Sequence, residues 1–283
     1  MKRIFLLFIF PFLVAVAESS SLVPTSGVYL GMGLSANSTR FDDQNVTATG
    51  TSTVTDTASG NFVSSGTAGG PAVGISMGRE HDISPSIQAG YFKRFKDSDY
   101  LWGAKLSYSY LGGSTATNDL IRIPQYGSWD GQPFTGNAIA SSYQKTIKHQ
   151  ISLVPYIGKA FNRGTLYLGA GPTVSQVSTK INDLVGFADV NGQRTDISGS
   201  PQDFSDKRWT FGATVMVGGT YYLDDSFFLD VSYSYTRTDN KTSDYFSTYS
   251  NIGSPNTLSG DLIGSSTGTA KLQSITININ KLF

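Results

Sequence analysis

The spacing of alternating segments constrains the fold of this chain more than any other feature. Eight stretches alternate apolar residues with small or polar ones at every second position, which is the pattern of β-strands whose two faces meet different surroundings. Three of the connections are turns of about four residues, and four are polar stretches of roughly 25 to 45 residues. Short turns at one end and long loops at the other predict an all-β, eight-stranded antiparallel up-and-down transmembrane β-barrel.

The predicted strands differ in how sharply they are bounded. The clearest alternation follows Lys96–Asp99, where Trp102, Ala104 and Leu106 share one face and Gly103 and Lys105 the other. The second strand ends near residue 95, and its start stays open because residues 73–77 also alternate and Pro85 interrupts the stretch. The other strands are predicted at about residues 27–37, 102–110, 143–159, 165–173, 207–222, 227–236 and 268–283.

A soluble β-sandwich is the alternative, because its strands also alternate. The second face of these strands carries Gly, Ser, Thr, Asn and Gln. Such residues make a poor dry core but suit the small wet lumen of a membrane barrel. Unpaired backbone groups are costly in hydrocarbon, so a sheet that faces lipid must close on itself. The residue types therefore favour the barrel.

The N-terminus predicts export. Met1–Arg3 is basic, an apolar run follows from Ile4 to Val16, and small residues stand at Ala15 and Ala17. This is the pattern of a secretory signal peptide over residues 1–17, which leaves a barrel domain over 18–283. The alternative is a membrane anchor, but about 13 apolar residues fall short of the roughly 20 that span a bilayer. We expect transport through the inner membrane and residence in the outer membrane.

Composition excludes several classes of chemistry. The chain has no cysteine, so thiolate catalysis and thiolate metal sites are excluded. Its formal net charge is zero, which argues against nucleic acid as a partner. Only two histidines occur, and His149 and Ser152 are expected on opposite faces of one strand, so a nucleophile and base pair is not favoured. We expect no enzyme, no cofactor and no metal site.

Two charged residues are expected inside the barrel. Lys105 and Asp230 each lie four or five residues from a short turn, on the polar face of their strands. A buried charge without a partner is costly, so we expect both to join a polar or ionic network that plugs the lumen, together with Gln150. The alternative is that each charge is hydrated separately.

Nearly all of the mature chain resembles a known family. Gly27-Val28-Tyr29-Leu30-Gly31, the stretch from Gly103 to Leu111 and the terminal Phe283 are similar to the small OmpA-like and opacity-type outer membrane proteins. The resemblance implies an eight-stranded barrel without a cofactor whose loops meet host or environmental ligands. It also implies that the last strand is a signal for the barrel-assembly machinery, although Lys281 departs from its apolar pattern. The residues that would carry this signal are Ile275, Ile277, Ile279 and Phe283.

Two functions remain open at this point. The first is a non-enzymatic surface protein of the outer membrane, in which the barrel displays four long polar loops for adhesion, for host or environmental contact, or for envelope integrity. The second is a narrow porin or small-solute channel. Eight strands enclose an interior that side chains almost fill, but the many lumen-facing glycines are expected to leave some room.

Overall fold

The computed structural model describes residues 22–283 apart from 113, 118, 119 and 191, so the predicted signal peptide lies outside the described residues. These residues form fifteen strands in one antiparallel sheet and no helix. The strands are β1 (Ser26–Asp56), β2 (Phe62–Gly69), β3 (Val73–Ile75), β4 (Arg79–Arg94), β5 (Tyr100–Tyr110), β6 (Ser114–Thr117), β7 (Ile121–Trp129), β8 (Gln132–Ala140), β9 (Ser142–Ala160), β10 (Gly164–Val190), β11 (Gln193–Asp196), β12 (Gln202–Tyr222), β13 (Phe227–Thr238), β14 (Ser243–Ile252) and β15 (Asn256–Leu282).

Eight of these strands close into a ring. Each pairs with its neighbour in the order β1, β4, β5, β9, β10, β12, β13 and β15, and β15 pairs again with β1. The expected eight-stranded antiparallel barrel is therefore confirmed. It is the architecture that the resemblance to the small OmpA-like proteins implies. The second predicted strand, β4, begins at Arg79 and runs through Pro85 without a break, whereas residues 73–75 form the separate strand β3.

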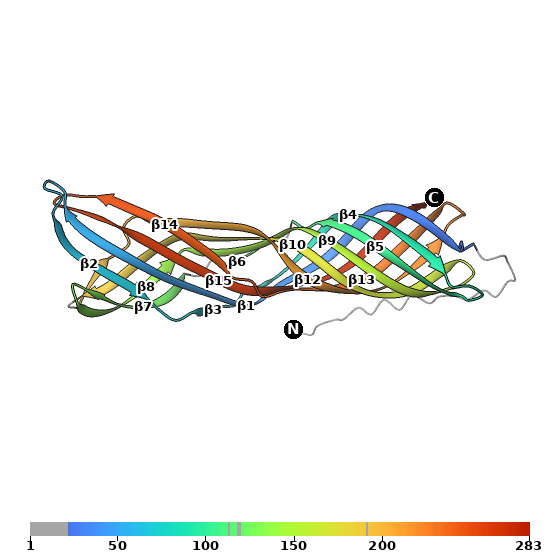
Figure 1. Cartoon of the computed structure of the whole chain (residues 1–283), viewed down its shortest axis with the longest axis horizontal. Coiled ribbons are helices and arrows are strands. Elements are labelled where there is room, and N and C mark those ends of the chain that lie inside the picture. Colours follow the sequence, from blue (N-terminus) through green and yellow to red (C-terminus); the bar gives the residue numbers. More distant parts are fainter. Residues whose placement is uncertain (1–21, 113, 118–119, 191) are drawn as a thin grey trace, which may run out of the picture.

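The four long connections are not the loops that the sequence predicts. Most of their residues continue the barrel strands or form added hairpins, such as β7 with β8 and β14 with β15. The sheet therefore extends well past the eight-stranded ring, and the molecule is long and narrow (Figure 1). We call this part the extension; it comprises residues 44–78, 111–147, 177–208 and 239–268, without the four positions that are not described. The missed signal is the Ser and Thr content of these stretches, since alternating Thr also suits strands.

The outer face of the ring is apolar. Along β1, Val28, Leu30, Met32 and Leu34 are 54 to 67% exposed. The next residue, Ser35, points to the inner face and is buried. We call this surface the apolar belt. Its members include Val28, Leu30, Met32, Leu34, Ile83, Ile87, Leu106, Ile151, Leu153, Ile157, Leu166, Leu168, Val215, Val217, Val231, Ile275, Ile277 and Ile279. With the exposed Ala36 it spans nine residues of β1, from Val28 to Ala36, within the 9–11 that a tilted strand needs to cross a bilayer.

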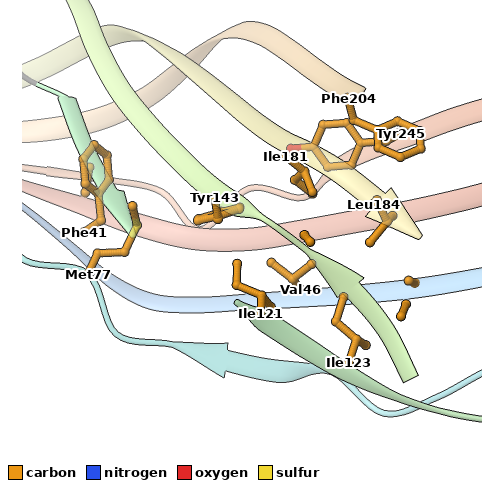
Figure 2. Packing of buried hydrophobic residues seen from close by; sticks show 14 of the residues in the cluster. Phe41, Val46, Met77, Ile121, Ile123, Tyr143, Ile181, Leu184, Phe204 and Tyr245 are labelled. Atoms are coloured by element: carbon orange, nitrogen blue, oxygen red, sulfur yellow. The ribbon is translucent and has the colours of Figure 1, made fainter. Parts of the chain in front are cut away.

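The two faces exchange character in the extension. Beyond the register shift between Asp42 and Asn45, Val46 and Ala48 point inward and are 1% exposed, while Thr47 and Thr49 lie on the outside. The inner apolar residues form a buried core with members from eight strands, part of which is shown in Figure 2. The outer face is thus apolar around the ring and mostly polar around the extension, and the extension encloses an apolar cluster.

Among the described residues, no helix is long and apolar enough to cross a membrane.

Candidate functional site

An ion pair crosses the lumen near the short-turn end. Lys105 on β5 and Asp230 on β13 stand on opposite sides of the ring, and the Lys105 Nζ lies 2.6 Å from the Asp230 Oδ2. Tyr167 on β10 completes a triangle, because its hydroxyl accepts from Lys105 at 2.6 Å and donates to the Asp230 Oδ1 at 2.8 Å. Both charged side chains are at most 3% exposed. The structure therefore brings together the two charged residues that the sequence places inside the barrel.

Tyrosine rings occupy the space above the lumen-facing glycines. Tyr29, Tyr156 and Tyr167 stand directly opposite Gly90, Gly103 and Gly218 on the neighbouring strands. A Cβ atom at any of these glycines would lie within 2.5 Å of the ring or hydroxyl of its tyrosine. The sequence predicts that lumen-facing glycines leave free room. At these three positions the space beside the glycine is instead occupied by a tyrosine ring. With Phe92, Leu101, Met216, Tyr222 and Phe228, the tyrosines form an apolar and aromatic layer across the lumen.

Gln150 belongs to a different network. Its Nε2 donates to Ser152 and Thr236 at 3.4 and 3.3 Å, and no hydrogen bond to Lys105 or Asp230 is found for it in the described residues. Hydroxyl groups continue this network along the wall, from Ser152 to Thr173, Thr214 and Thr236 at 2.5 to 2.7 Å. The three residues therefore form two networks instead of the predicted one. The reason is the strand register: Lys105 stands opposite Val154 on β9, which is four residues beyond Gln150.

A small polar chamber lies between two apolar layers. Its volume is about 40 Å³, room for a few water molecules, and Ser, Thr, Asn and Gln side chains line most of it. The other lining residues include Val154 and Met216, which belong to the same buried cluster as the lumen tyrosines, and Leu111 and Leu272, which belong to the buried cluster shown in part in Figure 2. Apolar side chains therefore border the chamber on two sides.

The extension encloses one unpaired buried cation. Lys145 is 4% exposed, and its Nζ donates to the Gln44 Oε1 at 2.5 Å. It lies above the apolar belt, beside a cavity of about 20 Å³ that Arg208 and Lys241 also line. Burial, and then the positive charge of Arg208, lower the pKa of Lys145 to about 8. The ion pairs of the described residues include none with Lys145.

The histidines lie on the outer face. The His149 ring packs between Tyr110 and Trp209, with centroid distances of 5.3 and 6.4 Å, and its Nδ1 lies 2.9 Å from the Tyr108 hydroxyl. Ser152 faces the lumen, so the two residues are on opposite faces as expected. The rings mark one rim of the apolar belt on this side, at the end of the ring that continues into the extension.

Three of the four residues of the predicted assembly signal are members of the apolar belt. Ile275, Ile277 and Ile279 point outward and are 48 to 54% exposed, and the Phe283 ring is 71% exposed. The Phe283 N–H donates to the Val28 carbonyl at 2.9 Å, which ties the chain end to β1. Recognition by the assembly machinery stays a prediction.

The far end of the extension carries exposed apolar residues. Phe62 and Ile252 are 64 and 78% exposed and belong to one cross-strand row with Thr55 and Thr257 between them. We call Phe62 and Ile252 the tip residues. Among the described residues, no group of His, Asp and Glu side chains could hold a metal ion.

Solved structures that are similar to this chain include three outer membrane proteins. They are the attachment invasion locus protein Ail of Yersinia pestis (11% identity, 83% of this chain and 98% of that one, TM-score 0.26), the outer membrane protein OprG of Pseudomonas aeruginosa (10%, 93% and 99%, TM-score 0.37) and the outer membrane protease OmpT of Escherichia coli (11%, 90% and 97%, TM-score 0.31). No protein-family model matches the chain, and no curated protein does. At these identities and TM-scores, the likeness adds nothing to what the strand pairing itself establishes.

Proposed function

We propose that this chain is a non-enzymatic surface protein of the outer membrane, in which a closed barrel carries a stiff β-extension that holds the tip residues away from the membrane. One observation carries the proposal. The same eight strands present apolar residues outward in the ring and polar residues outward in the extension. Lipid suits the first surface and water the second.

The interior supports a scaffold rather than a channel. The ion pair and the aromatic layer fill the lumen at one level, and the buried core of the extension fills it at another. The chamber between them holds only about 40 Å³. A narrow porin, the second candidate, needs a continuous wet path, so we expect no steady conductance when the purified protein is placed in a planar bilayer.

The extension gives the tip its reach. From Arg40 to Asp56, β1 continues for roughly 50 Å at about 3.3 Å per residue. With a strand tilt of 35–45°, this length raises the tip by roughly 40 Å above the apolar belt. We propose that the tip residues contact a host or environmental ligand, because large exposed apolar side chains at the end of a stiff stalk are placed for contact rather than for folding.

Single cysteines test the orientation, because the chain has none of its own. Ala58→Cys lies in the turn between β1 and β2, and Lys96→Cys lies in the short turn between β4 and β5. On intact cells, a membrane-impermeant maleimide should label Ala58→Cys and not Lys96→Cys, and both should react after the outer membrane is opened. Labelling of Lys96→Cys alone on intact cells, or recovery of the protein in the soluble fraction, would contradict the proposal.

The contact role has its own comparison. Cells that carry Phe62→Ser with Ile252→Ser should adhere less to cultured host cells and to abiotic surfaces than cells with the wild-type protein. The control is Tyr126→Ser with Phe246→Ser, which removes exposed rings from the side wall of the extension. Equal adhesion of all three strains at equal surface expression counts against a contact role of the tip.

A further inference from the structure

Four cations form a row across the outer face of four neighbouring strands. Arg79 on β4, Arg40 on β1, Lys271 on β15 and Arg237 on β13 are successive partners in the strand register. Arg79, Arg40 and Arg237 are exposed, and Lys271 is half-buried. Neighbouring strands lie about 4.8 Å apart, so this cationic row is roughly 14 Å long.

The cationic row lies directly above the apolar belt. On β4, Arg79 lies four positions from Ile83 of the belt. On β15, Lys271 lies four positions from Ile275 of the belt. In a strand tilted by 35–45°, four residues correspond to a rise of roughly 10 Å. The head-group layer extends about 5–8 Å beyond the hydrocarbon, and long Arg and Lys side chains reach back toward it. The row is therefore level with the lipid head groups.

The opposite side of the ring is built differently at this level. There the rings of Tyr110, His149 and Trp209 follow one another on β5, β9 and β12. That side carries three aromatic rings, with the exposed Lys148 and Lys207 beside them, whereas the cationic row sets four cations on directly paired strand positions. Aromatic rings suit the polar and apolar boundary in general, whereas a row of cations selects negative charge.

The cations of the row are only partly neutralised. Asp42 bridges the two central members, with its carboxylate oxygens 2.5 Å from the Arg40 Nε and 2.7 Å from the Lys271 Nζ. In the part of the chain that the structure describes, Arg79 and Arg237 form no ion pair, although the exposed Asp239 follows two residues beyond Arg237. Like charges on directly opposite strand positions destabilise a sheet. An anion bound along the row would remove this repulsion.

We propose that the cationic row binds the phosphate groups of a phosphorylated lipid in the outer leaflet. Charge complementarity and direct continuity with the apolar belt identify this partner, because one molecule can lay its acyl chains on the belt and its phosphates on the row. Guanidinium groups bind phosphate oxygens in a bidentate manner, which suits a row with three arginines. This inference rests on the proposed placement of the belt in a membrane.

The test uses the full mature chain in phosphatidylcholine vesicles with and without phosphatidic acid. The row variant is Arg79→Gln, Arg40→Gln and Arg237→Gln, which leaves the pair of Lys271 and Asp42 intact. The control variant is Arg122→Gln, Lys180→Gln and Arg194→Gln, which removes three exposed cations from the wall of the extension. Native mass spectrometry after extraction counts the phosphatidic acid that stays bound, and heat-modifiable gel migration reports folding.

We expect the row variant to retain phosphatidic acid less well by on the order of tenfold or more, and the control variant to match the wild type. Replacement of the same three arginines by lysine should preserve most of the binding, which separates charge from folding. Equal retention by the row and control variants overturns the proposal. So does displacement of the lipid by inorganic phosphate or by a soluble polysulfated glycan, since the site would then serve soluble anions. If the wild type does not insert into vesicles at all, the proposed function fails together with this inference.

Discussion

At the scale of single residues, polar groups in the lumen are stabilised by partners on distant strands. Lys105, Tyr167 and Asp230 come from three strands and satisfy one another. A buried ion pair contributes little net stability, but removal of one partner leaves a buried charge alone. The pair is therefore a constraint on how the ring closes rather than a source of stability in itself.

This asymmetry gives a prediction for the ion pair. Asp230→Asn should lower the free energy of unfolding by about 3–5 kcal/mol, because the Lys105 charge stays buried without a carboxylate. The double variant Lys105→Met with Asp230→Asn should recover most of the loss. Urea unfolding in detergent micelles, followed by tryptophan fluorescence, measures both. If the two variants lose the same stability, the pair is not coupled across the lumen.

At the scale of elements, extra residues in the strands decide which side chains face the core of the extension. Asp43 and Gln44 stand opposite the single Gly268, and Asp43 has a φ of 54°. Asp tolerates this left-handed conformation better than most residues. With an unbroken alternation, Val46 would follow Leu34 on the outer face, but the extra residue places it inside. A further shift occurs in β10, between Ile181 and Leu184, where Asp183 has a φ of 50°.

Single-residue deletions test this role of the bulge. Deletion of Asp43 should be tolerated, because Phe41, Gln44 and Val46 then still face inward along a regular strand. Deletion of Ser38, five positions earlier in the regular ladder, should prevent folding, since it turns Arg40 toward the lumen. The measured quantity is the fraction of protein with heat-modifiable migration after refolding. Equal fractions for the two deletions would show that the bulge does not set the register.

At the scale of the whole molecule, the ring and the extension are two cores on shared strands. The ring closes through its own ladder of eight pairings, whereas the extension depends on its buried interior. Ile123 on β7 lies in this interior and is fully buried, while its neighbour Arg122 is exposed. Damage to the interior should therefore open the extension and leave the ring intact.

A pair of neighbouring substitutions separates the two parts. Ile123→Asp buries a charge without a partner and should make the extension sensitive to proteinase K on intact cells, with membrane-protected fragments of the ring remaining. Arg122→Asp introduces the same side chain on the wet face and should stay as resistant as the wild type. Mass spectrometry of the protected fragments reads the result. Complete degradation of Ile123→Asp, ring included, would show that the two parts unfold as one.

The sequence by itself determined the eight alternating segments, the short turns and the presence of Lys105 and Asp230 on inward positions, because these follow from a period of two that any strand obeys. It did not determine the extension, since polar Thr-rich stretches are compatible with both loops and strands until they find partners. Nor did it show the pairing of each lumen tyrosine with a glycine, which depends on the register between strands. Only the tertiary structure decided these features, because an extra residue such as Asp43 changes which face every later residue occupies, and its position is set by pairing with a strand more than 200 residues away.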